Sequence, residues 1–382
     1  MFIPGVFYPE TVHHDQQPAL DKPHAFVLCF RNPDCIQCLY YAYPLSEFSF
    51  ENHNDRFGYT IKIGKSTFTE SCVDVDLDAA YLIHSQESDE AQFYTKAINE
   101  RLALHGAKIP TKFNHYEQKH LSVKGKIEMI NQTRIPTSTL NPGVMGPFAF
   151  LPFLECYHGI VSMYHDANGK VDFTNSDGTL ESSISLDQGT GYIEKDHGIR
   201  FPKSWIWLQT HSFHQNPKSR GSSLLFSAAD VPTLSDSVSK IPKVGEFLVA
   251  KTMMTGFLLV FYHAESKKTY NLSLFTGATI NRIDFKYVTE ADDRLFQLAD
   301  IKVSLRNVSI QLNVRRELGQ GIPLRAPTSK EMHLAIEESL NVEVHVQLFV
   351  DGALAFDDVG KEAGLEVVGD IIKIKKRINK AL

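Results

Sequence analysis

The residues best suited to chemistry lie in one central run, YIEKDHGIRFPKSWIWLQ, which extends from Tyr192 to Gln209. It contains two carboxyl groups, Glu194 and Asp196, followed by an imidazole, His197. A carboxyl group buried among aromatic side chains keeps its proton near neutral pH, because desolvation disfavours the anion. Such a group can act as a general acid, and a nearby histidine can relay protons. We therefore predict that Asp196 and Glu194 are candidate acids and that His197 and His158 are candidate relays.

Alternation along extended strands gives this run two surfaces. The residues that share them are Tyr192, Glu194 and Asp196 on one, and Trp205, Trp207 and Gln209 on the other. Indole faces stabilise a developing carbocation by about 1–2 kcal/mol each. If both surfaces line one cavity, that cavity would combine a proton donor with an aromatic wall. Simpler roles remain open, because the tryptophans could serve core packing and the carboxylates could pair with Lys195 and Arg200.

A second run, PGVMGPFAFLPFLECYHG, covers residues 142–159 and ends in polar side chains. On a strand, Glu155 and Tyr157 share one face, and His158 lies on the other. We predict that these three residues join Tyr192, Trp205, Trp207 and Gln209 in binding a substrate. The sequence has no glycine-rich phosphate loop, no GxSxG and no HExxH, so neither a cofactor nor a metal is expected.

Composition limits the class of protein. The 382 residues suffice for two domains, and 43% hydrophobic with 22% charged residues is ordinary for globular proteins. The formal net charge of −6 disfavours a nucleic-acid partner, because phosphate recognition needs clustered Lys and Arg. Five cysteines are an odd number, which favours reduced thiols and a cytoplasmic location. The N-terminal MFIPGVFYPE lacks the pattern of a signal peptide.

Alternating apolar and polar residues predict β-strands along most of the chain. Hairpins are expected at 60–68 with a turn at Gly64, at 162–173 with a turn at Asn168-Gly169, and at 342–356 with a turn at Asp351-Gly352. The segment 85–104 instead predicts a helix. The polar stretch 182–188 predicts a domain boundary. The basic, amphipathic tail 371–382 either contacts an anionic membrane surface or packs its isoleucines against the protein.

The central run resembles a motif of the tocopherol cyclase family, in which Gly-Tyr-Ile-Glu-Lys-Asp-Trp-Gly leads into Phe-Pro and a Trp-x-Trp-like strand. The other segments that match in order are 142–159, FTGA at 275–278, LRAP at 324–327 and AGLEVVGD at 363–370. Within the central run, His197 stands where the family has Trp. The resemblance covers most of the chain.

The resemblance implies a mainly β fold of two lipocalin-like antiparallel barrel or sandwich halves, as in the related carotenoid hydratase group, with one inserted helix near 85–104. The expected domains are 1–183, with a helical insertion at about 80–118, and 184–382. It also implies a chemistry. Tocopherol cyclases protonate the alkene of a prenylated hydroquinone, and the phenol oxygen then closes a chromanol ring. The motif places the candidate acids at Glu194 and Asp196, with Trp205 and Trp207 as the pocket wall.

Three functions remain open. The first is an enzyme that cyclises or isomerises a hydrophobic prenylated quinol, isoprenoid or polyene, and it predicts that Asp196 or Glu194 is buried, has a raised pKa and faces a cavity. The second is a carrier of a hydrophobic ligand, whose cavity would be lined by apolar groups alone. The third is a structural protein with a filled barrel.

Overall fold

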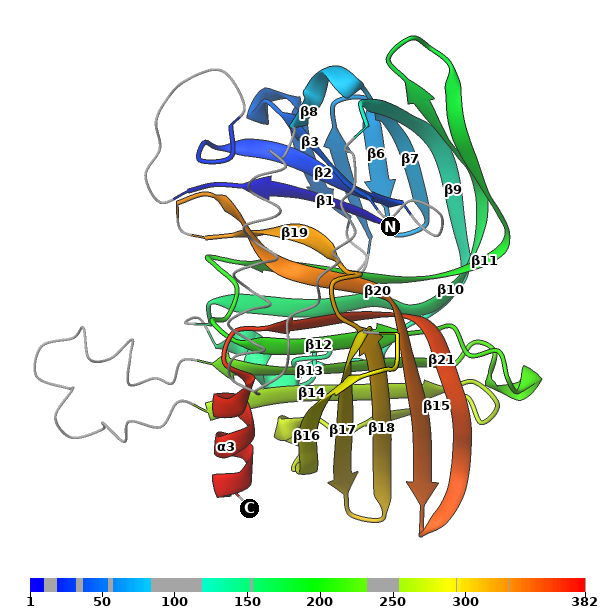
Figure 1. Ribbon diagram of the computed structural model, residues 1–382, viewed down its shortest axis with the longest axis vertical. Helices are drawn as coiled ribbons and strands as arrows, with labels where there is room; N and C mark the ends of the chain where they lie inside the picture. Colours follow the sequence, from blue (N-terminus) through cyan, green and yellow to red (C-terminus); the bar gives the residue numbers. More distant parts are fainter. Residues whose placement is uncertain are drawn as a thin grey trace, which may run out of the picture. The chain divides into compact units, whose positions relative to one another are not determined.

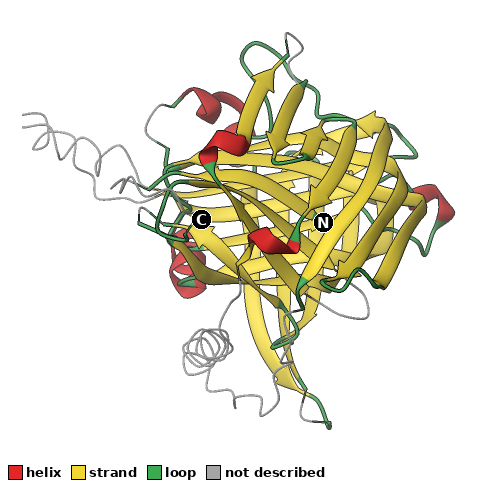
Figure 2. Cartoon of the chain, turned by 90° about the horizontal axis from the view of Figure 1, so that it is seen from above, coloured by secondary structure: helices red, strands yellow, loops and turns green. Residues whose placement is uncertain are grey.

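The computed structural model describes residues 1–9, 19–31, 37–53, 58–83, 119–151, 154–231, 254–292, 294–328 and 330–381. Antiparallel strands make up most of this part of the chain (Figure 2), which confirms the predicted fold class. The segment predicted as an inserted helix, 85–104, lies outside the described residues. Within the described ranges, no helix combines the length and the apolar character that crossing a membrane requires.

The chain folds into two compact units, and each is built from three segments of the sequence. Unit 1 contains residues 1–133, 164–193 and 322–335, whereas unit 2 contains 134–163, 194–321 and 336–382. These units interleave along the sequence, while the expected domains 1–183 and 184–382 are continuous. That expected division stays a prediction. The stretch expected as a linker, 182–188, lies inside strand β11 (Leu180–Gly198).

Unit 1 is organised around two antiparallel sheets that enclose an apolar core (Figure 1). One sheet has the order β1 (Phe2–Phe7), β2 (His24–Arg31), β3 (Gln37–Tyr43) and β8 (Leu82–Ile83). The other has the order β11, β10 (Cys156–Asn175), β9 (Leu121–Thr133), β7 (Cys72–Leu77), β6 (Ser66–Thr69), β5 (Tyr59–Ile63) and β4 (Phe48–Asn52). The core joins side chains of both sheets, such as Val27 and Tyr41 from the first and Val75 and Phe173 from the second. The sheets therefore pack face to face as in a sandwich.

Two of the three expected hairpins are confirmed. β5 and β6 pair on either side of a turn at Gly64, where φ is 57°. β20 (Met332–Val350) and β21 (Ala353–Val368) pair on either side of Asp351 and Gly352, where φ is 53° and 78°. Tight hairpin turns require positive φ angles of this kind.

The hairpin expected at Asn168-Gly169 is wrong. β10 continues through both residues and stays paired with β9. A Cβ atom added at Gly169 would lie 2.0 Å from the carbonyl oxygen of Lys126 in β9. Glycine is needed here because two backbones approach each other closely. The chain reverses between β10 and β11, where Gly178 has a φ of 84°.

Unit 2 is built on most of a ten-stranded antiparallel sheet. The strands of this sheet follow the order β15 (Lys268–Asn271), β14 (Met254–His263), β13 (Ser223–Val231), β12 (Trp205–Thr210), β21, β20, β18 (Val308–Glu317), β17 (Leu295–Leu305) and β16 (Thr279–Thr289). The tenth strand, β19 (Ile322–Pro327), pairs with β20 outside this order. One core cluster contains residues from strands near both ends of this order and from its middle, so the sheet curls around it. Ile206 and Leu208 of β12 face this core. Their neighbours Trp205 and Trp207 therefore lie on the opposite face.

Short 3₁₀ helices lie between some of the strands. They are η1 (Leu45–Glu47), η2 (Ala79–Tyr81), η3 (Gly146–Phe150), η4 (Pro217–Ser219) and η5 (Leu274–Thr276). The tail forms the helix α3 (Ile371–Ala381). Its side chains Ile371, Ile374 and Ile378 are buried in the unit 2 core, which confirms that the isoleucines pack against the protein. The apolar face of α3 is therefore occupied, and contact of the tail with a membrane stays a prediction.

The close approach at Gly169 yields a test of stability. Gly169→Ala is expected to lower the free energy of unfolding by about 1–3 kcal/mol, because the methyl group would collide with the backbone of β9. Urea denaturation followed by circular dichroism measures this difference. Gly143→Ala is the matched control, since nothing lies within 4 Å of a Cβ added there. Equal stabilities of the two variants would contradict the role given to Gly169.

Candidate functional site

The centre of the candidate site is the imidazole of His158, which lies near the start of β10. Its Nδ1 is 2.7 Å from Oδ1 of Asp196, and its Nε2 is 3.6 Å from Oε2 of Glu194. Both carboxylates come from β11, the neighbour of β10 in the sheet. Because side chains alternate along a strand, Glu194 and Asp196 share one face of β11 and reach the same imidazole. All three residues belong to unit 2.

The charge of His158 is determined by its two carboxylate neighbours. Its side chain is only 14% exposed, and this burial alone would lower its pKa. The negative charges of Asp196 and Glu194, the hydrogen bond to Asp196 and the charge of Glu366 outweigh the burial. Together they raise the pKa of His158 to about 9. The imidazole is therefore protonated at neutral pH and donates from Nδ1 to Asp196.

The two tryptophans of β12 each donate a hydrogen bond to a carboxylate. Nε1 of Trp207 lies 3.2 Å from Oε2 of Glu194, and Nε1 of Trp205 lies 2.5 Å from Oε2 of Glu366. Gly364 of β21 leaves room for the first indole, since a Cβ added there would lie 2.7 Å from the ring of Trp207. The structure thus brings together the two surfaces expected from the sequence, through the contact between Trp207 and Glu194.

A pair of glutamates, Glu338 of β20 and Glu366 of β21, extends the cluster. Glu338 is 2% exposed, and burial together with the charge and hydrogen bond of Glu366 raises the pKa of Glu338 well above its ordinary value. Burial also raises the pKa of Glu366, which is half-buried. The Arg316 guanidinium opposes the shift at Glu338. Two acids in such a position cannot both ionise readily, so the arrangement favours a proton on the pair.

The sequence analysis missed this pair, although the sequence contains a signal for each member. Glu366 lies within AGLEVVGD, one of the motifs that carry the family resemblance, and it pairs in register with Trp207. Glu338 follows another glutamate in a strand that also contains buried apolar residues, such as Val342 and Val344. An acid among apolar strand residues marks a candidate for a buried, protonated carboxyl group.

Other residues expected at the site take separate positions. Glu155 forms an ion pair with Arg200, whose Nε lies 2.8 Å from Oε1 of the carboxylate. Gln209 is buried and lies 3.1 Å from Nδ1 of His211 through its Nε2. Tyr192 is half-buried and belongs to unit 1, so it is described apart from the cluster.

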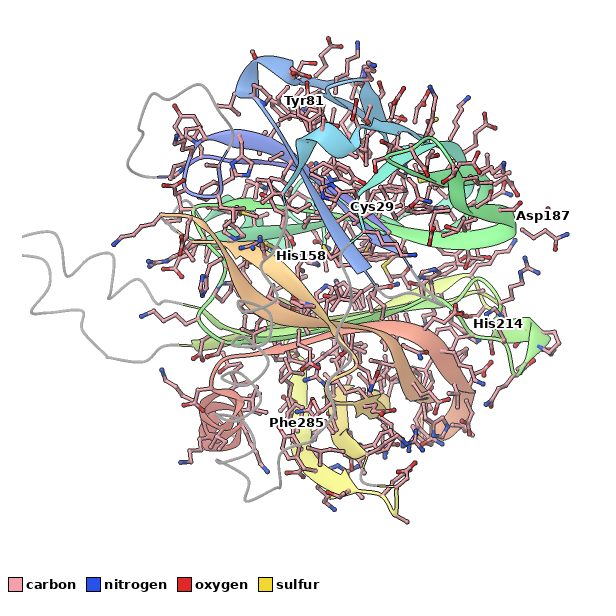
Figure 3. All side chains as sticks on the ribbon, turned by 45° about the horizontal axis from the view of Figure 1, so that its top comes forward. Cys29, Tyr81, His158, Asp187, His214 and Phe285 are labelled. Atoms are coloured by element: carbon pink, nitrogen blue, oxygen red, sulfur yellow. The ribbon has the colours of Figure 1, made fainter. Side chains whose placement is uncertain are left out.

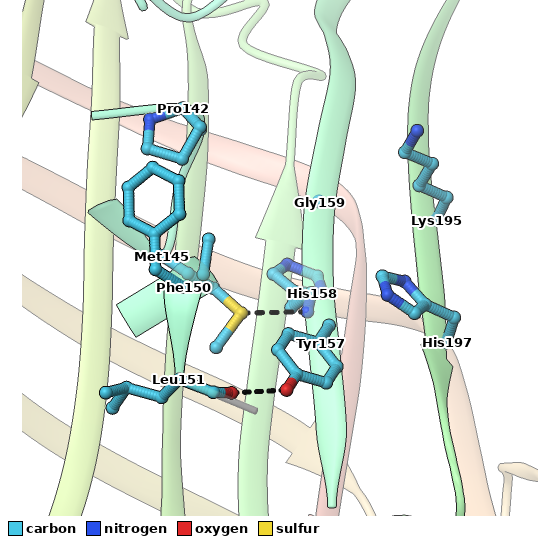
Figure 4. A pocket seen from close by; sticks show the side chains of 11 residues that line it. Pro142, Met145, Phe150, Leu151, Tyr157, His158, Gly159, Lys195 and His197 are labelled. Atoms are coloured by element: carbon cyan, nitrogen blue, oxygen red, sulfur yellow. Dashed lines mark hydrogen bonds between the residues drawn. The ribbon is translucent and has the colours of Figure 1, made fainter. Parts of the chain in front are cut away.

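His197 and Tyr157 lie together, but on the opposite face of the β10–β11 pair. Their rings stack with centroids 4.9 Å apart and an interplanar angle of 12°. They line a pocket of about 480 Å³ (Figure 4), together with Lys195 and apolar residues of the segment 142–151. The backbone of His158 borders this pocket, because its N–H donates to Sδ of Met145 at 3.1 Å. The relay role of His197 stays a prediction.

Three residues of the cluster have the chemistry of metal ligands. Ligand atoms of His158, Glu194 and Asp196 all lie within 4.8 Å of one another. A metal would have to displace the proton that these carboxylates hold on His158. Cys156, on the same face, is a poor further ligand, because burial and the charges of Asp196 and Glu194 raise the pKa of its thiol. The expectation of a site without metal or cofactor stays a prediction.

This arrangement is suited to proton transfer. Asp196 and Glu194 keep 31% and 25% of their side chains exposed, so a ligand can reach them. Behind them lie the protonated His158 and the proton-holding glutamate pair. Asp187, on the same strand as the two acids, is exposed, and its side chain points away from the ribbon in Figure 3. The cluster can therefore donate a proton at its open side and replace it from its buried side.

Comparisons with known proteins give likenesses at the level of the chain trace. No protein-family model and no curated protein matches the chain. It is similar to CghA, in a crystal structure with Sch210972, with a TM-score of 0.42 and 10% identity over 92% of this chain and 86% of that one. It is also similar to kievitone hydratase from Nectria haematococca, with a TM-score of 0.33 and 11% identity over 91% and 83%. The resemblance to the tocopherol cyclase family stays a prediction.

The charge of His158 can be measured directly. Nuclear magnetic resonance of the labelled imidazole is expected to give a titration midpoint near 9. Asp196→Asn removes a negative charge and a hydrogen-bond acceptor for the imidazolium, so the midpoint should fall. The exposed Asp187→Asn, on the same strand, should leave it in place. An unchanged midpoint in the Asp196 variant would show that Asp196 does not set the charge of His158.

Stability should depend on the same proton. The pKa of His158 rises from its ordinary 6.5 to about 9 on folding, so its contribution is complete below 6.5 and is lost as the pH rises through 9. The excess stability of the wild type over His158→Gln should fall by up to about 3 kcal/mol across this window. Denaturation at a series of pH values measures the difference. An excess that grows with pH contradicts a protonated His158.

Proposed function

We propose that this protein is an acid-catalysed cyclase or isomerase of a hydrophobic prenylated quinol or polyene, similar in chemistry to the tocopherol cyclases. The observation that carries the proposal is the cluster in which His158 is held between Asp196 and Glu194, with the proton-holding pair Glu338–Glu366 beside it. Groups with perturbed pKa values gather at sites of proton transfer. Here they adjoin indole rings and a partly open surface.

Asp196 is the proposed proton donor to the substrate. Its carboxyl group is 31% exposed, while His158 is 14% exposed and Glu338 only 2%. A substrate therefore meets Asp196 first. The imidazolium of His158 donates to Oδ1 of Asp196, and transfer of this proton to the carboxylate supplies the acid form of Asp196 that protonates the substrate. Glu194 has the second open carboxyl group and is the alternative donor.

The proposed reaction conserves atoms and charge. The π electrons of the substrate alkene form a new C–H bond with the carboxyl proton of Asp196, and the O–H electron pair stays on Asp196 as the carboxylate. A cation develops on the more substituted carbon of the former alkene. A lone pair of the substrate's phenol oxygen then forms a C–O bond to that carbon, and the phenol proton returns to the carboxylate. The product is an isomer of the substrate, and the acid is restored.

Two features of the site favour the cationic intermediate. The faces of Trp205 and Trp207 supply cation–π attraction of about 1–2 kcal/mol each. The carboxylates of the cluster also attract a positive charge that develops nearby. Both indole N–H groups donate to carboxylates, which fixes the orientation of their rings. A preorganised aromatic and anionic surface of this kind stabilises a cation more than it stabilises a neutral substrate.

The carrier hypothesis makes the opposite prediction for this cluster. A carrier binds its ligand unchanged and has no use for a shared proton beside its ligand surface. Proton-holding acids buried without need lower stability, because each carries a desolvation cost. The glutamate pair therefore favours an enzyme over a carrier.

Activity of acid variants tests the proposal. Asp196→Asn is expected to lower the rate of ring closure on a panel of prenylated hydroquinones by about 10²–10⁴-fold, since it removes the general acid. Asp187→Asn, an exposed acid of the same strand, is the matched control and should retain full activity. Liquid chromatography with mass spectrometry separates the ring-closed isomer from its substrate. Binding without turnover by the wild type across the panel would leave the carrier in place of the enzyme.

Solvent isotope labelling provides a second test that depends on mechanism. In D₂O the carboxyl proton exchanges, so the new C–H bond of the product should contain one deuterium from solvent. Mass spectrometry of the isolated product measures this mass increase. A ring-closed product without deuterium would mean that ring closure proceeds without protonation by the cluster.

A further inference from the structure

We propose that the pocket on the opposite face of β10 and β11 is a second small-molecule site, which binds an amphipathic carboxylate. It is lined by Met145, Phe150, Leu151, Tyr157, Lys195 and His197, together with smaller residues of the same segments. Its volume of about 480 Å³ falls within the range of ligand pockets. All of its lining residues belong to unit 2.

Strand alternation separates this pocket from the acid cluster. Lys195 and His197 line the pocket, whereas Glu194 and Asp196, which alternate with them on β11, reach the imidazole of His158. His158 borders the pocket through its backbone. The two sites therefore use opposite faces of the same pair of strands, and occupation of one does not require the other.

The walls of the pocket are suited to an apolar chain or ring. The rings of Tyr157 and His197 stack nearly parallel and form an aromatic part of the wall (Figure 4). Phe150, at the end of the short helix η3, is 60% exposed, which is unusual for a phenylalanine in a pocket wall. Exposed apolar side chains around a cavity mark a surface that gains stability when a ligand covers it.

The polar side of the pocket selects a negative charge. Lys195 supplies an ammonium group, and its stem crosses Gly159, where an added Cβ would meet Lys195 Cγ at 3.4 Å. Among the described residues, no Asp or Glu lines the pocket. Glu155, on the same face of the chain, is already paired with Arg200. A carboxylate joined to an apolar body fits this combination, because it satisfies the ammonium group and covers the apolar wall.

Calorimetric titration with octanoate and with octanol tests the charge selection on the wild-type protein. These probes share an apolar chain and differ in the headgroup. Octanoate is expected to bind one site at least about tenfold more tightly than octanol, because only octanoate can pair with Lys195. Lys195→Met should weaken octanoate about tenfold, toward the affinity of octanol, and Lys195→Arg should restore it.

Two control variants locate the binding site. Lys203→Met removes an exposed lysine outside the pocket and should leave octanoate binding unchanged. Asp196→Asn, which disables the proposed enzyme, should also leave it unchanged. Octanol binding as tightly as octanoate, no octanoate binding, or no effect of Lys195→Met would overturn the proposal. Loss of octanoate binding in the Asp196 variant would assign the ligand to the acid cluster and would overturn it as well.

Discussion

Four carboxyl groups gather near one imidazole in this protein. Glu194, Asp196, Glu338 and Glu366 all influence one another or His158, and the described cations that act on them include His158 itself and Arg316. Full ionisation would place four negative charges in a partly dehydrated space. Such charges are costly, so the cluster retains protons instead. The imidazole stays charged, and one proton is shared by the buried glutamates.

The fold makes this concentration of charge tolerable by separating it from the core. β12, β20 and β21 present apolar side chains such as Ile206, Val342 and Leu365 to the core of unit 2. The other face of β12 and β21 presents the indoles and Glu366. The hydrogen bond from Nε1 of Trp205 satisfies one oxygen of the Glu366 carboxylate. A cluster of acids inside the core would destabilise the whole unit. On the reverse of a well-packed sheet, it is held rigidly by strands whose stability comes from elsewhere.

The sequence predicted much of the local structure and only part of the site. Period-two alternation identified the strands, and positive-φ turn residues identified two hairpins, because both signals are local. The hairpin prediction at Asn168-Gly169 was wrong because it used the same local signal. Glycine is needed there to make room for the backbone of β9, which is distant in sequence. Likewise, Asp196 and Glu194 were identified from neighbouring residues. Glu338 and Glu366 required knowledge that β21 lies between β12 and β20, which only tertiary pairing reveals.

The position of His197 on β11 separates its ring from the acid cluster. The resemblance to the tocopherol cyclases places Trp there, next to the proposed acid Asp196. In this protein the ring of His197 lies on the far face of the strand and stacks on Tyr157. The acid cluster is formed by the alternate residues and does not include this ring. Exchange of indole for imidazole therefore keeps a flat aromatic wall and adds a polar edge to the pocket. Glu194 and Asp196 keep their contacts with His158 on the other face of the strand.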